Sequence, residues 1–527
     1  MLSGLYSDTG FADTPSVVDN WNLGPTDPLQ SKATELVAFC YPKPSMLTPG
    51  SNAAHGYEAL KGLLTPENLK HFLQLYKHWQ NHWPMMHPSF NPTTAYDGLI
   101  LTMVCIGAIY SDKMGVRQVR WLMELVRASV FRSSQVYKTV TQKVQHHLDD
   151  SVSLSASMEE IQALIHIHSL FVWHGSMKQR QQGQEEAWML ASIARKFELL
   201  HPLPVGHIHC SALHQPGPVS GEEVNTWTWD SWREQERRIR IMYMVLLIDA
   251  SLAMFFNIQP QFDIYDIQLP LPADDAAWEA TTEEDCAKAL GLRGRDAQEM
   301  NHAGSRRPKQ LTMTEALALL HQGNNFPHRA TNAFSKFILI HAIHIQIYKL
   351  QRQLLSFSIS GLASSGSSTP QSHNDWTSPD GTLSNNSSGY VTPTEGFSAQ
   401  HSQAQLMLRS TTFALMLWKK HWDADMHVQY GANQRPLGFC RDGVHFYFLA
   451  KAFLQSSRRD EWAAQPETRF QQVFTFLKHI KAHVASDSAS KNLDIGSVTS
   501  VSDQYGVEDL TVDMKLLFTP ISDPLPL

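Results

Sequence analysis

The chain has 527 residues, enough for one large core or for two or three domains. It carries 43 basic and 50 acidic side chains, and the net charge of −7 gives no support to direct nucleic-acid binding through phosphate contacts. The five cysteines form no C-x-x-C pair, which argues against a paired-cysteine zinc site and against a disulfide framework. The first residues lack the basic start and apolar run of a signal peptide, so we expect a reducing intracellular setting.

Residues 1–54 are rich in Pro, Ser, Thr, Asp and Gly and show no sustained periodicity, which predicts a disordered acidic and aromatic segment. Near its start, the stretch "LYSDTGFADTPSVVDNW" intersperses acids with aromatic residues and has no cation. The stretch "YGVEDLTVDMKLLF" near the C-terminus has a similar character. Such compositions resemble acidic activation segments, although ordinary disordered termini have them too.

Helical signals begin at "TPENLKHFLQLYKHWQNHW", where Thr65 can cap a helix and apolar residues recur at helical spacing. The same spacing continues through several segments up to residue 201, and no convincing series of alternating strands occurs. We therefore predict an all-α fold, a large multi-helix bundle whose main domain spans 55–355.

The segment "TWDSWREQERRIRIMYMVLLIDASLAMFF" has charges crowded in its first turns and almost none afterwards. A membrane span needs about 20 uncharged apolar residues, and Asp249 follows Arg240 too closely to leave that room. We predict a central core helix and no membrane contact. A buried Asp249 then needs a hydrogen-bonding or cationic partner.

A second helical block ends near residue 355, and residues 356–400 consist mainly of Ser, Gly, Thr and Asn. That composition predicts a disordered linker, because it buries too little apolar surface to offset its ordering entropy. Helices resume over 401–490, where we expect them to pack on the main domain. The remaining residues, 491–527, are predicted to form a flexible acidic and apolar tail.

Signatures of catalysis are mostly absent, since the chain has no G-x-S-x-G, H-E-x-x-H, P-loop or G-x-G-x-x-G motif. The best cluster of metal-ligand types is His207, His209, Cys210 and His214, which suits zinc or copper. Two prolines make this stretch look like a plain surface loop instead. We expect no catalytic residues, no metal and no cofactor.

Several segments resemble the fungal transcription factor regulatory domain, also named the middle homology region. An aromatic-rich helix leads into "WPMMHPSF", which is similar to the family signature through Pro84, His87, Pro88 and Phe90. The helix "EEAWMLASIARKFELLH" resembles a family helix more loosely. It carries Trp188 and His201.

The strongest resemblance lies around the central helix. The family pattern is Trp, Glu-x-x-Arg-Arg, an apolar helix ending in Asp, then Pro, Leu-Pro and Trp. This chain supplies it with Trp232, Glu234, Arg237, Arg238, Asp249, Pro260, Pro270 and Trp278. Arg240 stands where the family usually has an aromatic residue. The resemblance implies that these residues are structural, with a ligand-contact role as the alternative.

The resemblance also implies a nuclear regulator of transcription in a filamentous fungus, acting on a specific gene set, with biosynthetic genes as one candidate set. Relatives usually carry a binuclear zinc cluster or two-cysteine–two-histidine zinc fingers before this domain, whereas only Cys40 precedes it here. The resemblance therefore implies a DNA-binding partner factor or the transcription machinery as partner, with DNA contacted indirectly. The alternative is that the module was lost in evolution or from the gene model.

A short basic run contains Arg306, Arg307 and Lys309 and is the best candidate for nuclear import, against a plain solvated loop. The competing function is a scaffold or a sensor of a small-molecule effector without a promoter role. A cavity for such an effector would be lined by residues such as Trp173, Met242, Met254 and Phe255, although core packing is the simpler explanation for these side chains. An α-helical lyase is a third reading, but no constellation of carboxylates or metal ligands supports it.

Overall fold

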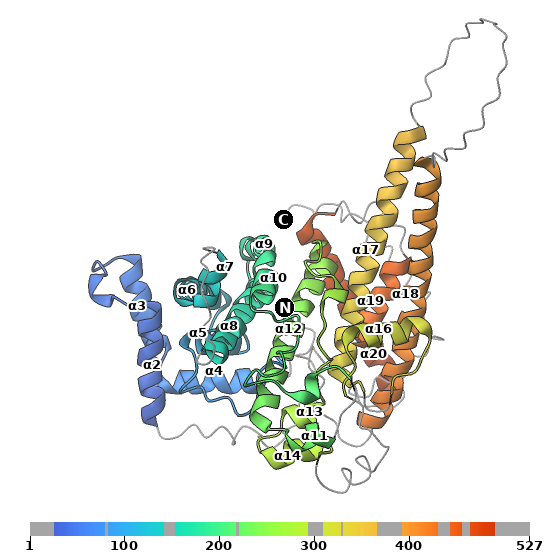
Figure 1. The fold of residues 1–527 in the computed structure, drawn as a ribbon. Coiled ribbons are helices and arrows are strands. Elements are labelled where there is room, and N and C mark those ends of the chain that lie inside the picture. The colour runs from blue at the N-terminus through green and yellow to red at the C-terminus, as the bar shows by residue number, and fades with distance from the viewer. Residues whose placement is uncertain are drawn as a thin grey trace, which may run out of the picture.

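The protein is all-α in the computed structural model, as the sequence predicts (Figure 1). Within the described residues, the one trace of β structure is an isolated antiparallel bridge between Pro270 and Thr312. The structure describes residues 26–78, 83–141, 153–217, 221–292, 309–327, 330–365, 393–430, 443–455 and 464–490.

The N-terminal half is a group of helices on one side of the molecule (Figure 1). In chain order they are α2 (Thr26–Cys40), α3 (Asn52–Leu63), α4 (Pro66–His78), α5 (Asp97–Ile109), α6 (Val116–Ser133), α7 (Gln135–Thr141), α8 (Ser153–His174), α9 (Met177–Glu185) and α10 (Ala187–Lys196). Helices α4 and α5 approach closely at Gly107, where an added Cβ would lie 2.1 Å from the carbonyl oxygen of Phe72. Only glycine permits this crossing.

Helix α2 lies in the segment that we expected to be disordered, and it corrects that expectation for residues 26–40. Its buried residues recur at helical spacing and join the main core. Lys32 fastens the helix, because its Nζ lies 2.6 Å from Oδ1 of Asp97 and donates to the carbonyl of Ala95 at 2.9 Å. The apolar stripe consists of Leu29, Ala33, Leu36, Val37 and Cys40.

Helix α12 (Trp229–Phe256) runs through the centre of the molecule (Figure 1). It packs against α8 and α10 on one side and against α17 and α20 on the other. The helix is long and apolar enough to cross a membrane, but its apolar window is completely buried inside the protein. It is therefore the core helix of the fold, and it ends at Asn257 in the left-handed conformation with φ 60°.

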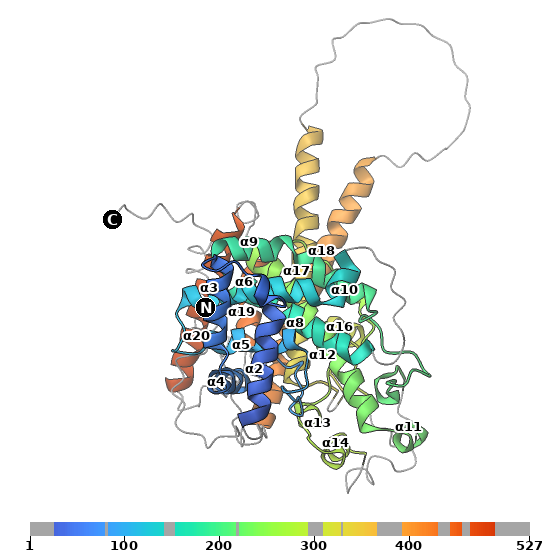
Figure 2. The ribbon, with the colours of Figure 1, turned by 90° about the vertical axis from the view of Figure 1, so that its left-hand side faces the viewer.

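The C-terminal half contains α16 (Met313–Gln322), α17 (Ala333–Ser365), α18 (Pro393–Tyr430), α19 (Val444–Gln455) and α20 (Pro466–Ser490). Helices α17 and α18 lie side by side and project beyond the rest of the molecule (Figures 1 and 2). Both extend into the segment predicted as a linker, since backbone hydrogen bonding continues to Ser365 and begins at Pro393. Residues 366–392 lie outside the described residues, as do the predicted tail and residues 1–25.

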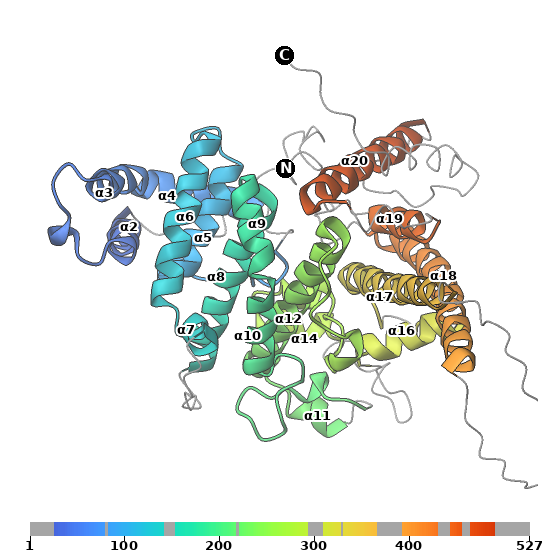
Figure 3. The same cartoon turned by 90° about the horizontal axis from the view of Figure 1, so that it is seen from above.

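Helix α20 lies on the side of the C-terminal helices, beside α19, and one of its ends is near α12 and α9 (Figure 3). Its Glu467 forms an ion pair with Arg180 of α9, and Arg469 donates through Nε to the carbonyl of Met254 in α12 at 3.0 Å. The 401–490 helices therefore pack on the preceding domain through defined polar contacts in addition to the shared core.

A second, smaller core lies beside the first turns of α12. The short elements that form it are η4 (Ala212–His214), α11 (Gly221–Asn225), α13 (Asp275–Trp278) and α14 (Glu283–Ala289). Its buried residues are Trp232, Ala273, Ala277, Ala280, Cys286, Ala287, Leu290 and Leu292.

Candidate functional site: the polar half of helix α12

The first half of α12 buries an ion pair between Glu236 and Arg240, and both side chains are 0% exposed. The two residues are four apart on the helix, a spacing that brings their side chains together. Nε of Arg240 donates to Oε1 of Glu236 at 2.7 Å. The same oxygen accepts the backbone N–H of Ala273 at 3.0 Å, and the other accepts Nε2–H of His214 at 3.1 Å.

The charge on Glu236 is stabilised by these neighbours. Burial raises the pKa of the carboxyl, but Arg240 and His214 outweigh burial and hold its pKa below the ordinary value. Glu236 is therefore an ionised carboxylate inside the protein, and its partners are the condition for burying it.

Arg240 connects three segments that are far apart in the sequence. Its Nη1 donates to the carbonyl of Pro84 at 3.1 Å, and its Nη2 donates to the carbonyl of Ala273 at 2.8 Å. Its guanidinium lies 4.7 Å from the ring centroid of Trp278, where a cation–π interaction adds to the pairing. In the sequence, Arg240 stands out only as a departure from the family's usual aromatic residue, although its four-residue spacing from Glu236 is a signal of this pairing.

The two arginines of the family pattern leave the helix in different directions. Nη2 of Arg237 donates to Oε1 of Gln162 in α8 at 2.8 Å, and Nη1 lies 3.7 Å from Glu234. Nη2 of Arg238 donates to the carbonyls of Phe197 and Glu198, at 3.3 and 3.0 Å. Those carbonyls follow the end of α10, so Arg238 caps that helix.

His87 lies at the edge of this cluster, with its ring 4.9 Å from that of Trp278 in an edge-on contact. Nδ1 of His87 accepts from the hydroxyl of Ser89 at 2.7 Å and from its backbone N–H at 3.1 Å. Burial, together with Arg233, Arg240 and Arg237, lowers the pKa of His87 to about 3, so the ring is neutral.

The other predicted residues are placed unequally. Trp232 is buried in the small core and stacks on His214 at 5.8 Å. Pro84, Pro260 and Pro270 are buried, and Pro88 and Phe90 are partly buried. In contrast, Trp188 is 46% exposed and His201 is exposed, so the structure does not bring these two into the cluster.

Asp249 stands two turns beyond the polar cluster, in the apolar half of α12. Its carboxylate accepts the backbone N–H groups of Gln261 at 2.9 Å and Phe262 at 3.2 Å. Burial raises its pKa to about 6 against the opposing effect of these bonds and of Lys349 and Arg195. The carboxylate has the hydrogen-bonding partners that burial requires, and it fixes the turn in which Pro260 lies.

Comparison with known proteins decides what this arrangement belongs to. Residues 69–420 match the family described as "Fungal specific transcription factor domain". The chain belongs to this family. The resemblance read from the sequence is thereby confirmed, and the family is one of transcription factors, not of enzymes.

Individual relatives of this transcription factor domain are distant. Transcription factor verF of Penicillium polonicum is 23% identical over 284 residues, 50% of this chain and 36% of verF. Transcription factor PfmaH of Pestalotiopsis fici is 23% identical over 143 residues, 27% of this chain and 14% of PfmaH. Zinc finger protein zas1 of Schizosaccharomyces pombe is 22% identical over 223 residues, 41% of this chain and 22% of zas1. The chain thus matches well under half the length of these relatives, and no solved structure matches it.

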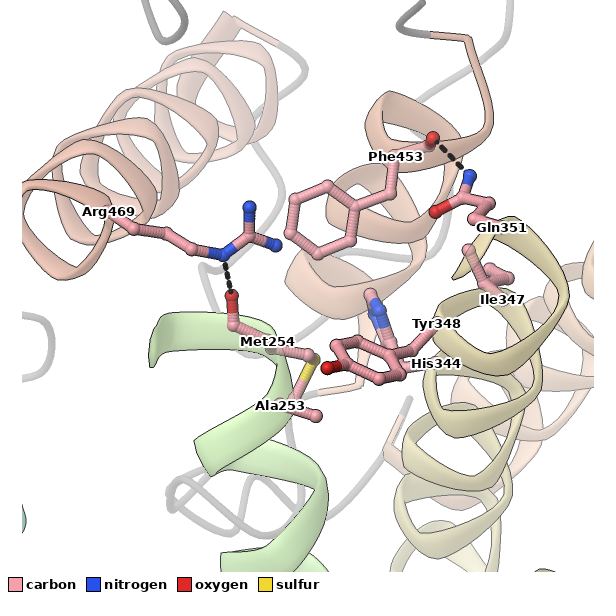
Figure 4. Close-up of a pocket in the computed structure, with 8 residues that line it drawn as sticks. All are labelled: Ala253, Met254, His344, Ile347, Tyr348, Gln351, Phe453 and Arg469. Atoms are coloured by element: carbon pink, nitrogen blue, oxygen red, sulfur yellow. Dashed lines mark hydrogen bonds between the residues drawn. The ribbon is translucent and has the colours of Figure 1, made fainter. Parts of the chain in front are cut away.

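A small pocket lies between the apolar half of α12 and helices α17, α19 and α20 of the transcription factor domain (Figure 4). Its volume is about 10 Å³, room for about one water molecule, whereas small-molecule sites occupy roughly 300 Å³ or more. The pocket therefore gives no support to an effector. Its lining residues are Ala253, Met254, His344, Ile347, Tyr348, Gln351, Phe453 and Arg469.

Most of the predicted cavity residues pack in the core instead. Trp173 contacts the ring of Phe255 edge-on at 4.9 Å, and Met242 is 0% exposed. Of the four, only Met254 reaches the pocket, where its carbonyl accepts from Arg469.

The histidine-rich stretch of this domain does not gather as a metal centre. His214 is turned inward to Glu236, while the rings of His207 and His209 lie 5.8 Å apart on the loop. Among the residues that the structure describes, no group of three or more His, Cys, Asp or Glu side chains is placed to hold a metal ion. Of the import candidates, Lys309 begins a described range, and Arg306 and Arg307 lie outside it.

Proposed function

We propose that this chain regulates the transcription of a specific gene set in a fungal nucleus, and that it acts through protein contacts made by its helical regulatory domain. The observation that carries the proposal is the inward orientation of the charged side chains in the first half of α12. Glu236, Arg238 and Arg240 bond to other parts of the same protein, which supports a structural role for this cluster and not a role in binding a substrate. What remains for recognition is the outer surface.

The proposal includes indirect contact with DNA. Specific recognition needs cations for several phosphates and an element that reads base edges. Cys40, the one cysteine before residue 69, is 3% exposed in the contact of α2 with the core, and burial raises its pKa to about 11. Cys40 therefore packs in the core and is not placed to ligate zinc, and the net charge of −7 does not favour phosphate contacts, so we propose a partner factor as the source of DNA contact.

Deletion of the gene followed by transcript profiling tests the regulatory role. A coherent set of transcripts should change, and reintroduction of the wild-type gene should restore it. Unchanged transcripts under conditions in which the protein is expressed would contradict the proposal and favour a scaffold.

A retention assay with the purified full chain tests the indirect contact with DNA. At near-physiological salt the chain should retain no promoter fragment selectively. Nanomolar, sequence-selective retention by the isolated chain would refute this part of the proposal while leaving a regulatory role intact.

Nuclear entry through the basic run has its own test. A fluorescent fusion of the full chain should accumulate in nuclei, and the change of Arg306, Arg307 and Lys309 to Ala should disperse it. The matched control changes three exposed cations elsewhere, Lys61, Lys70 and Lys113, which should leave localisation unaltered. Nuclear accumulation that survives the first change would exclude this run as the import signal.

A further inference from the structure

Helix α18 exposes an apolar face. Four of the ten strongly exposed large apolar side chains in the described part of the chain belong to this one helix. They are Leu406, Met407, Phe413 and Met416, with exposed fractions of 63%, 47%, 50% and 61%. Isolated exposed apolar residues are normal, but a group on one element marks an interaction surface.

The exposed residues follow a line along the helix. Phe413 is seven residues after Leu406 and Met416 is three residues later, a spacing that repeats on one face of a helix. Arg409 and Lys420 continue the same line and are exposed, and neither forms an ion pair with another described residue. We define the α18 face as the residues on this line. It is apolar with two cations and consists of Leu406, Arg409, Phe413, Met416 and Lys420.

The location of the α18 face leaves it accessible. Helix α18 contacts α16, α17 and α19 through its opposite side, where Ala414 and Trp418 are buried. It stands at the edge of the molecule when seen from the front and from above (Figures 1 and 3). Phe413 borders the end of α16, because an added Cβ on Gly323 would lie 3.2 Å from its ring.

The sequence contains a segment with complementary properties. In the stretch 507–518, the residues Val507, Leu510, Met514, Leu517 and Phe518 recur at the spacing of one helical face. The acids Glu508, Asp509 and Asp513 fall outside that stripe, and Lys515 is the one cation of the stretch. Its pattern is thus apolar with an acidic surround, the counterpart of the α18 face.

We propose that residues 507–518 bind the α18 face of the same chain as an amphipathic helix. The apolar stripes cover each other, and the acids lie near Arg409 and Lys420. Residues 491–506 connect the end of α20 to this segment, and sixteen residues reach about 50 Å when extended. Helix α20 contacts α19, which contacts α18, so the connection starts two helices away from its target. This contact does not depend on the regulatory function proposed above.

Photo-crosslinking in the full chain tests the contact. In the variant Phe413→p-benzoylphenylalanine, irradiation should join position 413 to a residue between 507 and 518, as identified by mass spectrometry. The matched control places the same photo-reactive residue at Tyr265, which is 52% exposed on another element and should give no such product. A mixture of isotopically light and heavy chains distinguishes crosslinks within one chain from crosslinks between two copies.

Charge reversal sharpens the test. Arg409→Glu with Lys420→Glu should reduce the crosslink yield several-fold, because the attraction between this face and the acidic residues of 507–518 becomes repulsion. Glu508→Lys with Asp509→Lys should restore the yield in that background. Both changes in α18 are at exposed positions, so we expect the helical circular dichroism and the melting temperature to be unchanged. These two measurements show that the variant is folded.

Three results would overturn the proposal. Crosslinks of position 413 only to a second copy would make the α18 face a dimer interface. Crosslinks only to other segments of the chain, or no crosslink above the Tyr265 control, would also exclude the contact. A crosslink yield that is unchanged by charge reversal would contradict the proposed interaction of the acids with Arg409 and Lys420.

Discussion

The two halves of α12 solve the problem of burial in opposite ways. Around Glu236 and Arg240 the helix buries charge, and each charged group is held by partners from several segments. From Met242 to Phe256 it buries almost only apolar surface, with Asp249 as the charged exception. Charge burial fixes the partners' positions to within hydrogen-bond distance, whereas apolar burial demands only volume and shape. The polar half therefore specifies the arrangement of the fold, and the apolar half supplies much of its cohesion.

Arg240→Met should cause the largest loss of stability, about 3–5 kcal/mol in the free energy of unfolding, because it leaves the buried carboxylate of Glu236 without its main partner. Chemical denaturation measures it. The control is Arg233→Met, whose partner Asp230 is 79% exposed and whose loss should cost less than about 1 kcal/mol. Equal losses in the two variants would show that burial of the Glu236–Arg240 pair carries no special cost.

Asp249→Asn tests the charge in the apolar half. The folded pKa of about 6 exceeds the ordinary value of 3.8, so the stability contribution of Asp249 is full below pH 3.8 and is lost as the pH rises through 6. The difference corresponds to about 3 kcal/mol at most. Unfolding measured from pH 4 to 7 should therefore show that the variant gains on the wild type as pH rises. A constant difference over that range would contradict the raised pKa.

His87→Gln tests the pH dependence of the free energy of unfolding in the polar half, where the expected dependence has the opposite sign. The folded pKa of about 3 lies below the ordinary value of 6.5, so the stability contribution of His87 is present above pH 6.5 and is lost as the pH falls toward 3. The variant should lose less stability than the wild type between pH 6.5 and 4, by about 3 kcal/mol, an amount similar to that for Asp249. A parallel pH profile in wild type and variant would mean that the pKa of His87 is the same in the folded and the unfolded chain, which would contradict the lowered pKa.

Met242→Leu should have the smallest effect, below about 1.5 kcal/mol, because the apolar half tolerates exchange at nearly constant volume. Its counterpart in the polar half is Arg240→Lys, which conserves charge but not the fork of donors and should cost more. Thermal unfolding of the two variants compares them. If Met242→Leu proved the costlier, the contrast between the halves would fail.

The sequence allowed the central position of α12 to be predicted, since Asp249 stands too near Arg240 for a membrane span. It also predicted that Asp249 needs partners, but not that Gln261 and Phe262 provide them, because a turn's backbone geometry decides that. The pairing of Arg240 with Pro84 joins positions 156 residues apart, a contact that a single sequence does not encode visibly. Helix α2 was missed because composition averaged over residues 1–54 concealed a short apolar stripe.

The roles assigned to the family-pattern residues stay predictions where no geometry bears on them, as for Trp188 and His201. Both carry the loosest part of the resemblance, and both are exposed. Their surface positions fit neither the polar cluster nor the main core. For this segment, the family pattern therefore selects residues that do not belong to the buried core.

The partners of Arg240 also impose an order on biosynthesis. Pro84 is made 156 residues before Arg240 and Ala273 is made 33 residues after it. A nascent chain that has just completed α12 holds an arginine whose final acceptor has not yet been synthesised, and at about 5–20 residues per second the wait lasts seconds. During that interval the polar half of α12 remains hydrated, and the apolar half is the part that a chaperone must cover. Closure of the two helix groups around α12 comes later still, because α17 and α20 are synthesised after Ala273.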